Sequence, residues 1–125
     1  MIAHLDSHVA VWLRMGDQRR LRPIKRTLAR AQLVLSPFVL LELQTLFEIG
    51  RLREAGRWIL ESLGEDHGVQ LATQGLDAAT ERAVDLTFTR DPFDRLISAH
   101  ALSASAVLLT ADQDLLRHVS CARWG

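Results

Sequence analysis

Short apolar segments recur along the chain and are separated by longer stretches with helical spacing. The short segments, which we predict to be strands, lie at residues 2–5, 33–35, 69–72 and 106–110. The last of them is continuously apolar and too short for a helix, as expected for a strand that is covered on both faces. Residues 122–124 are predicted to form an edge strand.

Apolar residues at helical spacing fill the stretches between these segments. They predict helices at residues 8–15, 19–31, 36–49, 53–63, 77–86, 91–105 and 112–118. Two of the helix starts are marked by a capping residue before proline, Ser36 with Pro37 and Asp91 with Pro92. Gly50 is a stop signal for the first of these two helices, and residues 64–68 are expected to be a polar loop.

Strands that alternate with helices predict an α/β protein, a three-layer α/β/α sandwich with a central parallel sheet. The length of 125 residues fits one domain spanning residues 1–125. In such sheets ligands bind beyond the carboxyl ends of the strands. Asp6 and Asp112 each follow a predicted strand, so we expect the functional site at this edge.

Four carboxylates are embedded in apolar segments of the chain: Asp6, Glu42, Asp94 and Asp112. Burying an ionised carboxylate is unfavourable by several kcal/mol unless a cation or hydrogen-bond donors compensate it. A cluster made only of oxygen ligands suits Mg²⁺ or Mn²⁺. We therefore predict that these four acids form a metal site.

Each of these acids also has a structural alternative. Asp6 and Asp112 each precede a predicted helix and could serve as its N-cap. Asp94 lies in the first turn of a helix and could interact with the helix dipole, while Asp91, just before that helix, is assigned to capping. Glu42 could lie on a hydrated helix face.

Charge is balanced overall but unevenly distributed. The 15 basic and 15 acidic residues give a formal net charge of zero. Seven basic residues nevertheless crowd one segment: Arg14, Arg19, Arg20, Arg22, Lys25, Arg26 and Arg30. This segment is either a surface for a phosphate backbone or a solvated helix face.

Cysteine content and hydropathy bear on the compartment. The single cysteine, Cys121, excludes an internal disulfide and fits a reducing environment. The longest apolar stretches fall well short of the roughly 20 residues that span a bilayer. We expect a cytoplasmic protein without membrane association.

Three other classes of site fit the sequence poorly. His4 and His8 are separated by a strand-to-helix break, which places them badly for sharing a zinc ion. A haloacid-dehalogenase phosphatase needs a second aspartate two residues after Asp6, where this chain has His8. A response-regulator receiver needs a lysine after a late strand, and the only lysine is Lys25.

The order of motifs along residues 2–124 resembles that of PIN-domain ribonucleases, in particular the toxins of the virulence-associated protein C (VapC) type. The motifs are Leu-Asp-Ser-His, Leu-Glu-Leu, Asp-Pro-Phe-Asp-Arg and Leu-Leu-Thr-Ala-Asp. The resemblance implies that the metal-binding acids are Asp6, Glu42, Asp94 and Asp112, with the hydroxyls of Ser7 and Thr110 beside the first and the last. Serine stands at position 7, where the family more often has threonine, and it keeps the hydroxyl. The resemblance also implies a homodimer and an antitoxin partner.

The activity that the resemblance implies is hydrolysis of RNA. One or two Mg²⁺ or Mn²⁺ ions would hold the scissile phosphodiester and activate a water, leaving a 5′ phosphate. Arg95 and Arg90 flank the acids and could contact the phosphate, or an arginine beside two aspartates could form only a salt bridge, the structural role that we favour for Arg95. The alternative is a catalytically inactive PIN-fold module that binds RNA or protein. The tryptophans Trp12, Trp58 and Trp124 are expected to pack in the core or a dimer interface rather than to stack on bases.

Overall fold

A computed structural model describes all 125 residues and contains one five-stranded sheet in the order β3-β2-β1-β4-β5. The strands are β1 (Ile2–Leu5), β2 (Gln32–Leu35), β3 (Gln70–Leu71), β4 (Val107–Leu109) and β5 (Ala122–Arg123). All four pairings are parallel, which confirms the predicted sheet. The chain builds outward from β1 first on one side and then on the other, so the strand order reverses at β1.

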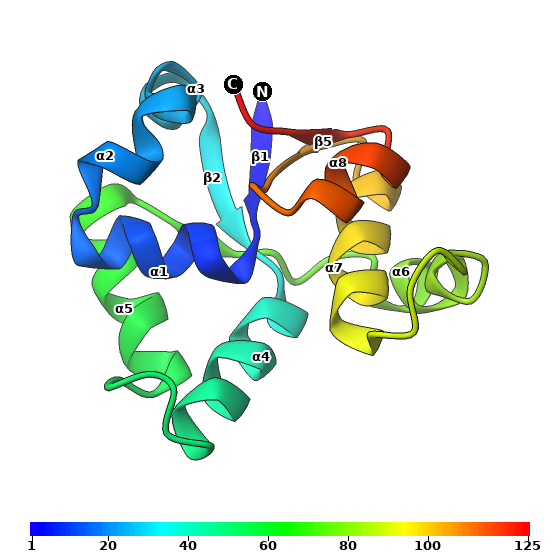
Figure 1. Cartoon of the computed structure of the whole chain (residues 1–125), viewed down its shortest axis with the longest axis horizontal. Helices are drawn as coiled ribbons and strands as arrows, with labels where there is room; N and C mark the ends of the chain where they lie inside the picture. Colours follow the sequence, from blue (N-terminus) through cyan, green and yellow to red (C-terminus); the bar gives the residue numbers. More distant parts are fainter.

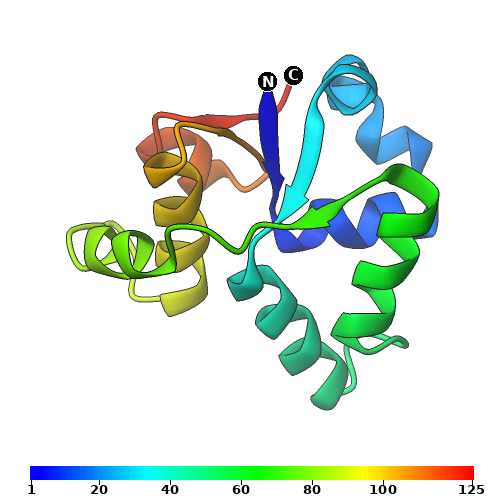
Figure 2. The same ribbon diagram turned by 180° about the vertical axis from the view of Figure 1, so that it is seen from behind.

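Helices flank the sheet on two sides (Figures 1 and 2). They are α1 (Ser7–Met15), α2 (Gln18–Leu21), a 3₁₀ turn η1 (Arg22–Ile24), α3 (Lys25–Arg30), α4 (Pro37–Glu48), α5 (Gly56–His67), α6 (Leu76–Ala83), α7 (Pro92–Ser103) and α8 (Gln113–His118). In Figure 1, α1–α3 and α5 lie to the left of the sheet, α6–α8 lie to the right, and α4 lies below. The predicted three-layer α/β/α arrangement is therefore confirmed. None of these helices combines the length and the apolar character needed to cross a bilayer.

The central strand is covered on both faces. Ala3, His4 and Leu5 are each at most 2% exposed, although successive side chains of a strand point to opposite faces. Leu108 and Leu109 of the neighbouring β4 are fully buried as well. This burial explains why the strand segments are apolar without alternation, and it anchors the strand ends that carry Asp6 and Asp112.

The prediction of one continuous basic helix over residues 19–31 is wrong. The segment is broken into α2, η1 and α3, with Pro23 in the 3₁₀ turn. Proline has no backbone N–H, and its ring clashes with the carbonyl of the preceding helical turn. The segment therefore forms two short helices joined by a 3₁₀ turn instead of one continuous helix.

The helix predicted over residues 53–63 begins later, at Gly56, because α4 and α5 pack closely there. A Cβ atom at Gly56 would lie 2.8 Å from the carbonyl oxygen of Leu40, so only glycine fits. The Gly56 N–H donates to Oε1 of Gln44 at 3.1 Å. This contact depends on two segments meeting in space, which helical spacing within one segment does not reveal.

Two other helix ends were misplaced by the sequence reading. The predicted loop at residues 64–68 is wrong, because α5 continues to His67 and ends at Gly68 in the left-handed conformation (φ 69°). The helix predicted over residues 77–86 starts one residue earlier, after Gly75, and ends at Ala83, three residues before the predicted end.

A buried histidine connects the two helices that carry Glu42 and Asp94. His100 on α7 places Nε2 2.8 Å from the carbonyl oxygen of Gln74 and Nδ1 2.7 Å from Oγ of Ser36, the N-cap of α4. A carbonyl only accepts, so Nε2 carries the proton and Nδ1 accepts from the Ser36 hydroxyl. The N-terminal end of α4 is thereby fixed to the last turns of α7.

Candidate metal centre

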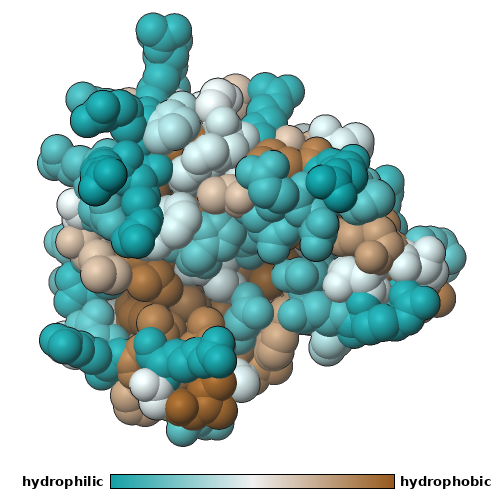
Figure 3. All heavy atoms as spheres, viewed as in Figure 1, coloured by the Kyte–Doolittle hydropathy of each residue, from teal (hydrophilic) through white to brown (hydrophobic).

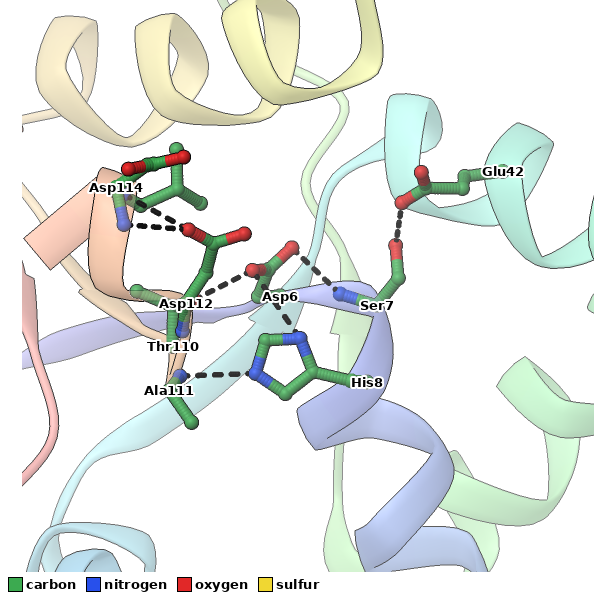
Figure 4. Close-up of polar contacts among 9 residues, drawn as sticks. Asp6, Ser7, His8, Glu42, Thr110, Ala111, Asp112 and Asp114 are labelled. Atoms are coloured by element: carbon green, nitrogen blue, oxygen red, sulfur yellow. Dashed lines mark hydrogen bonds and ion pairs between the residues drawn. The ribbon is translucent and has the colours of Figure 1, made fainter. Parts of the chain in front are cut away.

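All four acids predicted from the sequence line one pocket of about 390 Å³ at the carboxyl edge of the sheet. Asp6 directly follows β1 and Asp112 lies beyond the end of the neighbouring β4, while Glu42 projects from α4 and Asp94 from α7. Figure 4 shows Asp6 and Asp112 close together, with Glu42 approaching from the far side of Ser7. The remaining lining residues are Ser7, His8, Val11, Trp12, Leu46, Leu52 and Asp91.

Asp6 is only 5% exposed, and both oxygens of its carboxylate accept hydrogen bonds. Its Oδ1 accepts from the backbone N–H of Ser7 at 2.8 Å, and its Oδ2 accepts from Oγ1 of Thr110 at 2.7 Å. Oγ1 of Thr110 in turn accepts from the N–H of Asp112 at 3.1 Å. Asp6 therefore caps α1 and faces the pocket, so the two alternatives drawn from the sequence coexist in one side chain.

Glu42 is oriented by the hydroxyl of Ser7, which donates to its Oε1 (Figure 4). Burial raises the pKa of Glu42, the hydrogen bond from Ser7 opposes that rise, and repulsion from Asp6 and Asp91 adds to it. The backbone N–H of Ser7 bonds to Asp6, so one residue connects the first two acids. Ser7 thus lies where the family resemblance implied a hydroxyl.

Asp94 has the most perturbed carboxyl group of the pocket. Burial is the main cause that raises its pKa to about 7, and repulsion from the surrounding carboxylates adds to it. Those carboxylates are Asp91, Asp6, Asp112 and Glu42. No lysine or arginine lines the pocket to offset this negative charge. The pocket therefore concentrates carboxylates without a protein cation.

Two capping acids also face this pocket. Asp91, assigned from the sequence only to capping, does accept from the N–H groups of Phe93 at 2.9 Å and Asp94 at 3.3 Å. It nevertheless lines the pocket as a fifth carboxylate, which the sequence reading missed. Asp112 likewise caps α8, because its Oδ1 accepts from the N–H of Leu115 at 3.1 Å and from that of the preceding residue.

His8 also lines the pocket. From the sequence it was considered only as a zinc ligand, and that role was rejected. Its Nε2 accepts from the N–H of Ala111 at 2.9 Å, so its proton is on Nδ1, which lies 3.5 Å from Oδ2 of Asp6 (Figure 4). The ring packs edge-on against Trp12, with centroids 4.8 Å apart. His8 thus bridges the first acid and the segment that carries the fourth.

Replacing His8 with alanine is expected to weaken Mn²⁺ binding by about 10-fold, because losing a group that orients a ligand typically weakens metal affinity 10- to 100-fold. Isothermal titration calorimetry with Mn²⁺ measures this effect. His67→Ala, at an exposed position near the end of α5, is the matched control. Equal affinities of the wild type and the His8 variant would show that this bridge does not position Asp6.

The arginines flanking the acids point to backbone carbonyls. Nε of Arg95 donates to the carbonyl of Thr89 at 2.9 Å, and Nη1 of Arg90 donates to that of Thr87 at 2.9 Å. Neither arginine lines the pocket or forms an ion pair with its acids. Both hold the loop that leads into α7.

The donor set of the pocket fits a hard divalent cation. Five carboxylates face the pocket, and they repel one another. A bound divalent cation would relieve this repulsion. No three of these side chains converge closely enough to form a ready-made metal cluster. Mg²⁺ is compatible with such an open arrangement because it usually keeps several waters.

Fold and pocket together define a class of small parallel α/β proteins with an all-carboxylate pocket at the carboxyl edge of the sheet. Within that class the chain belongs to the PIN domain family, whose model matches residues 3–120. This confirms the family expected from the motifs.

Structural comparison supports the same fold. The chain is similar to a chain in the crystal structure of VapBC2 from Rickettsia felis bound to a DNA fragment from their promoter. The two share 18% identity with a TM-score of 0.67, over 94% of this chain and 93% of that chain. A sequence comparison with curated proteins finds no match.

Proposed function

We propose that this PIN-domain protein is an endoribonuclease that depends on Mg²⁺ or Mn²⁺ and is the toxin of a toxin–antitoxin pair. The observation that carries the proposal is the pocket of five carboxylates without a lysine or arginine, in which the pKa of Asp94 is raised to about 7. Such a pocket favours a divalent cation, and a divalent cation favours phosphodiester hydrolysis.

In this proposal the metal ligands and catalytic acids are Asp6, Glu42, Asp94 and Asp112. Bound Mg²⁺ or Mn²⁺ supplies activation of water and stabilisation of the leaving oxygen. Thr110 and Ser7 act as positioning residues, because their hydroxyls fix Asp6 and Glu42 respectively. Arg95 supports the site indirectly by holding the loop before α7.

The partners we propose are RNA as substrate, a cognate antitoxin and a second copy of the chain. The similar VapBC2 structure supports an antitoxin partner, because that protein was solved as a VapBC complex. Large apolar side chains that a protein partner could cover are exposed on α4 and α5, among them Leu41 at 57% and Trp58 at 56%. A toxin that cleaves cellular RNA would act in the cytoplasm.

A second candidate function is an inactive PIN-fold module that binds RNA or protein without cutting. The observation that favours it is the absence of three carboxylates close enough to form a ready metal cluster. The two candidates differ in one outcome, namely whether the folded protein cleaves RNA when metal is supplied.

The deciding experiment is incubation of the purified protein with structured and single-stranded RNAs in Mg²⁺, Mn²⁺ or chelator, beside Asp6→Asn. We expect cleavage only with metal, and products with 5′ phosphates. The variant should not cleave, because Asp6 lines the pocket directly after β1 and is a proposed metal ligand. A folded wild type that binds RNA or a partner but never cuts would support the inactive module instead.

A further inference from the structure

Three arginines, Arg14, Arg51 and Arg53, line a groove beside the acid pocket and differ in how their charge is used. Nη2 of Arg14 donates to Oε2 of Glu54 at 2.9 Å, and the same oxygen accepts from Nε1 of Trp58 at 2.7 Å. In contrast, Arg51 and Arg53 are exposed on the loop between α4 and α5, and neither has a carboxylate within 4.0 Å. Their positive charge is therefore available to a ligand.

Arg51 and Arg53 border a groove of about 610 Å³ between α1, α5 and this loop. Its apolar lining comes from Val11, Met15, Leu52 and Ile59. Figure 3 shows an apolar area below α1 and beside α5, bordered by hydrophilic side chains.

The groove adjoins the acid pocket, because Val11 and Leu52 line both. The combined depression runs from five carboxylates at one end, across an apolar strip, to two unpaired arginines at the other. A ligand that extends from the acid pocket along this strip reaches Arg51 and Arg53.

We infer that this groove, called here the arginine groove, binds the single-stranded RNA segment adjoining the scissile phosphate. The inference rests on the proposed function and adds to it a binding site for the RNA beside the scissile phosphate. Carboxylates in the pocket repel the phosphates that flank the scissile one, whereas Arg51 and Arg53 attract them. The apolar strip contacts bases or sugars, which is possible only where the bases are unpaired and their faces are exposed.

The test compares two double variants of the full chain. Arg51→Ala with Arg53→Ala removes the unpaired charges of the arginine groove. Arg26→Ala with Arg30→Ala removes two exposed arginines from α3, inside the basic segment that the sequence suggested as a phosphate surface. Arg51→Lys with Arg53→Lys keeps the positive charge and tests for rescue.

Cleavage kinetics of a single-stranded RNA with Mn²⁺ give the first readout. We expect the groove variant to raise KM about 10-fold with kcat changed less than about twofold, because the lost contacts are to flanking phosphates. The α3 variant is expected to change KM less than about twofold. In the lysine variant, KM is expected to lie close to the wild-type value.

Fluorescence anisotropy of the same RNA, in an Asp6→Asn background that prevents cutting, gives the second readout. The slope of log affinity against log salt is expected to fall by about 1.4 in the groove variant, at roughly 0.7 per phosphate contact with a single strand. An unchanged KM and slope, an equal loss in the α3 variant, or undiminished affinity for a duplex RNA would overturn the inference. Failure of the proposed nuclease activity can be told apart from failure of the inference. In that case the wild-type protein would not cut RNA, while anisotropy would still measure whether the groove binds it.

Discussion

Replacing Asp94 with asparagine is expected to abolish metal-dependent RNA cleavage and, at the same time, to stabilise the metal-free protein above pH 7. The loss of cleavage should reach at least about 100-fold, since removing groups that merely orient metal ligands already weakens metal affinity or activity 10- to 100-fold. Gain of stability with loss of activity is expected because burial disfavours the ionised carboxylate of Asp94, and repulsion from the other four acids of its pocket adds to this effect.

The sign of the stability effect follows from the raised pKa of Asp94, about 7 in the folded protein against roughly 3.9 in an unfolded chain. The folded state holds the proton more strongly, so the free energy of unfolding falls as the pH rises between these two values and is constant above them. Asparagine does not ionise and avoids this loss. Solvent screening of the partly exposed group reduces the expected gain to about 1–2 kcal/mol at pH 8.

Urea unfolding in chelator at pH 4.5 and pH 8 measures this effect. The variant should gain stability relative to wild type as the pH rises. Asp114→Asn is the matched control, because Asp114 lies in α8 with a side chain that is 75% exposed and does not line the pocket. A variant less stable than wild type at pH 8 would contradict the repulsion inferred here.

Elements with strong local signals were predicted correctly from the sequence. The N-cap of α4 is Ser36, whose Oγ accepts from the N–H of Phe38 at 3.2 Å, and Pro37 takes the first helical position, as expected. The strand β4 was also predicted from a local signal, the continuous apolar run at residues 106–110. Such features depend on residues that are neighbours in the chain.

Elements shaped by tertiary contacts were predicted less well. The start of α5 is set by the close approach of Gly56 to Leu40 on another helix. Helical spacing of apolar residues in the sequence suggested a start at residue 53. The backbone at residues 53–55 instead stays outside the helix, and this loop is where Arg53 borders the arginine groove.

The candidate site shows the same division. Asp6, Glu42, Asp94 and Asp112 line one pocket at the carboxyl edge, where the topology placed the site. No three of them lie close enough to form a metal cluster, so their role as metal ligands stays a prediction. The contribution of Asp91 was missed because a capping role was taken as sufficient, whereas the structure shows one carboxylate capping a helix and facing a pocket together.

Mn²⁺ affinity is expected to depend steeply on pH. A carboxylate ligates the ion in its ionised form, so protons compete with metal wherever the pKa of a ligand is raised. With the pKa of Asp94 at about 7, the ionised fraction, and with it the apparent affinity, should fall about 25-fold between pH 7.5 and pH 5.5. The raised pKa of Glu42 acts in the same direction.

Calorimetry in two buffers of different ionisation enthalpy tests this coupling by counting the protons released on binding. About one proton released per ion is expected at pH 5.5, where Asp94 is protonated before metal binds. Almost none is expected at pH 8, where Asp94 is already ionised. Asp114→Asn should retain both values, since its side chain lies outside the pocket. Equal Mn²⁺ affinities at the two pH values, without proton release, would mean that Asp94 is not a ligand and that the ion binds to the acids at the strand ends alone.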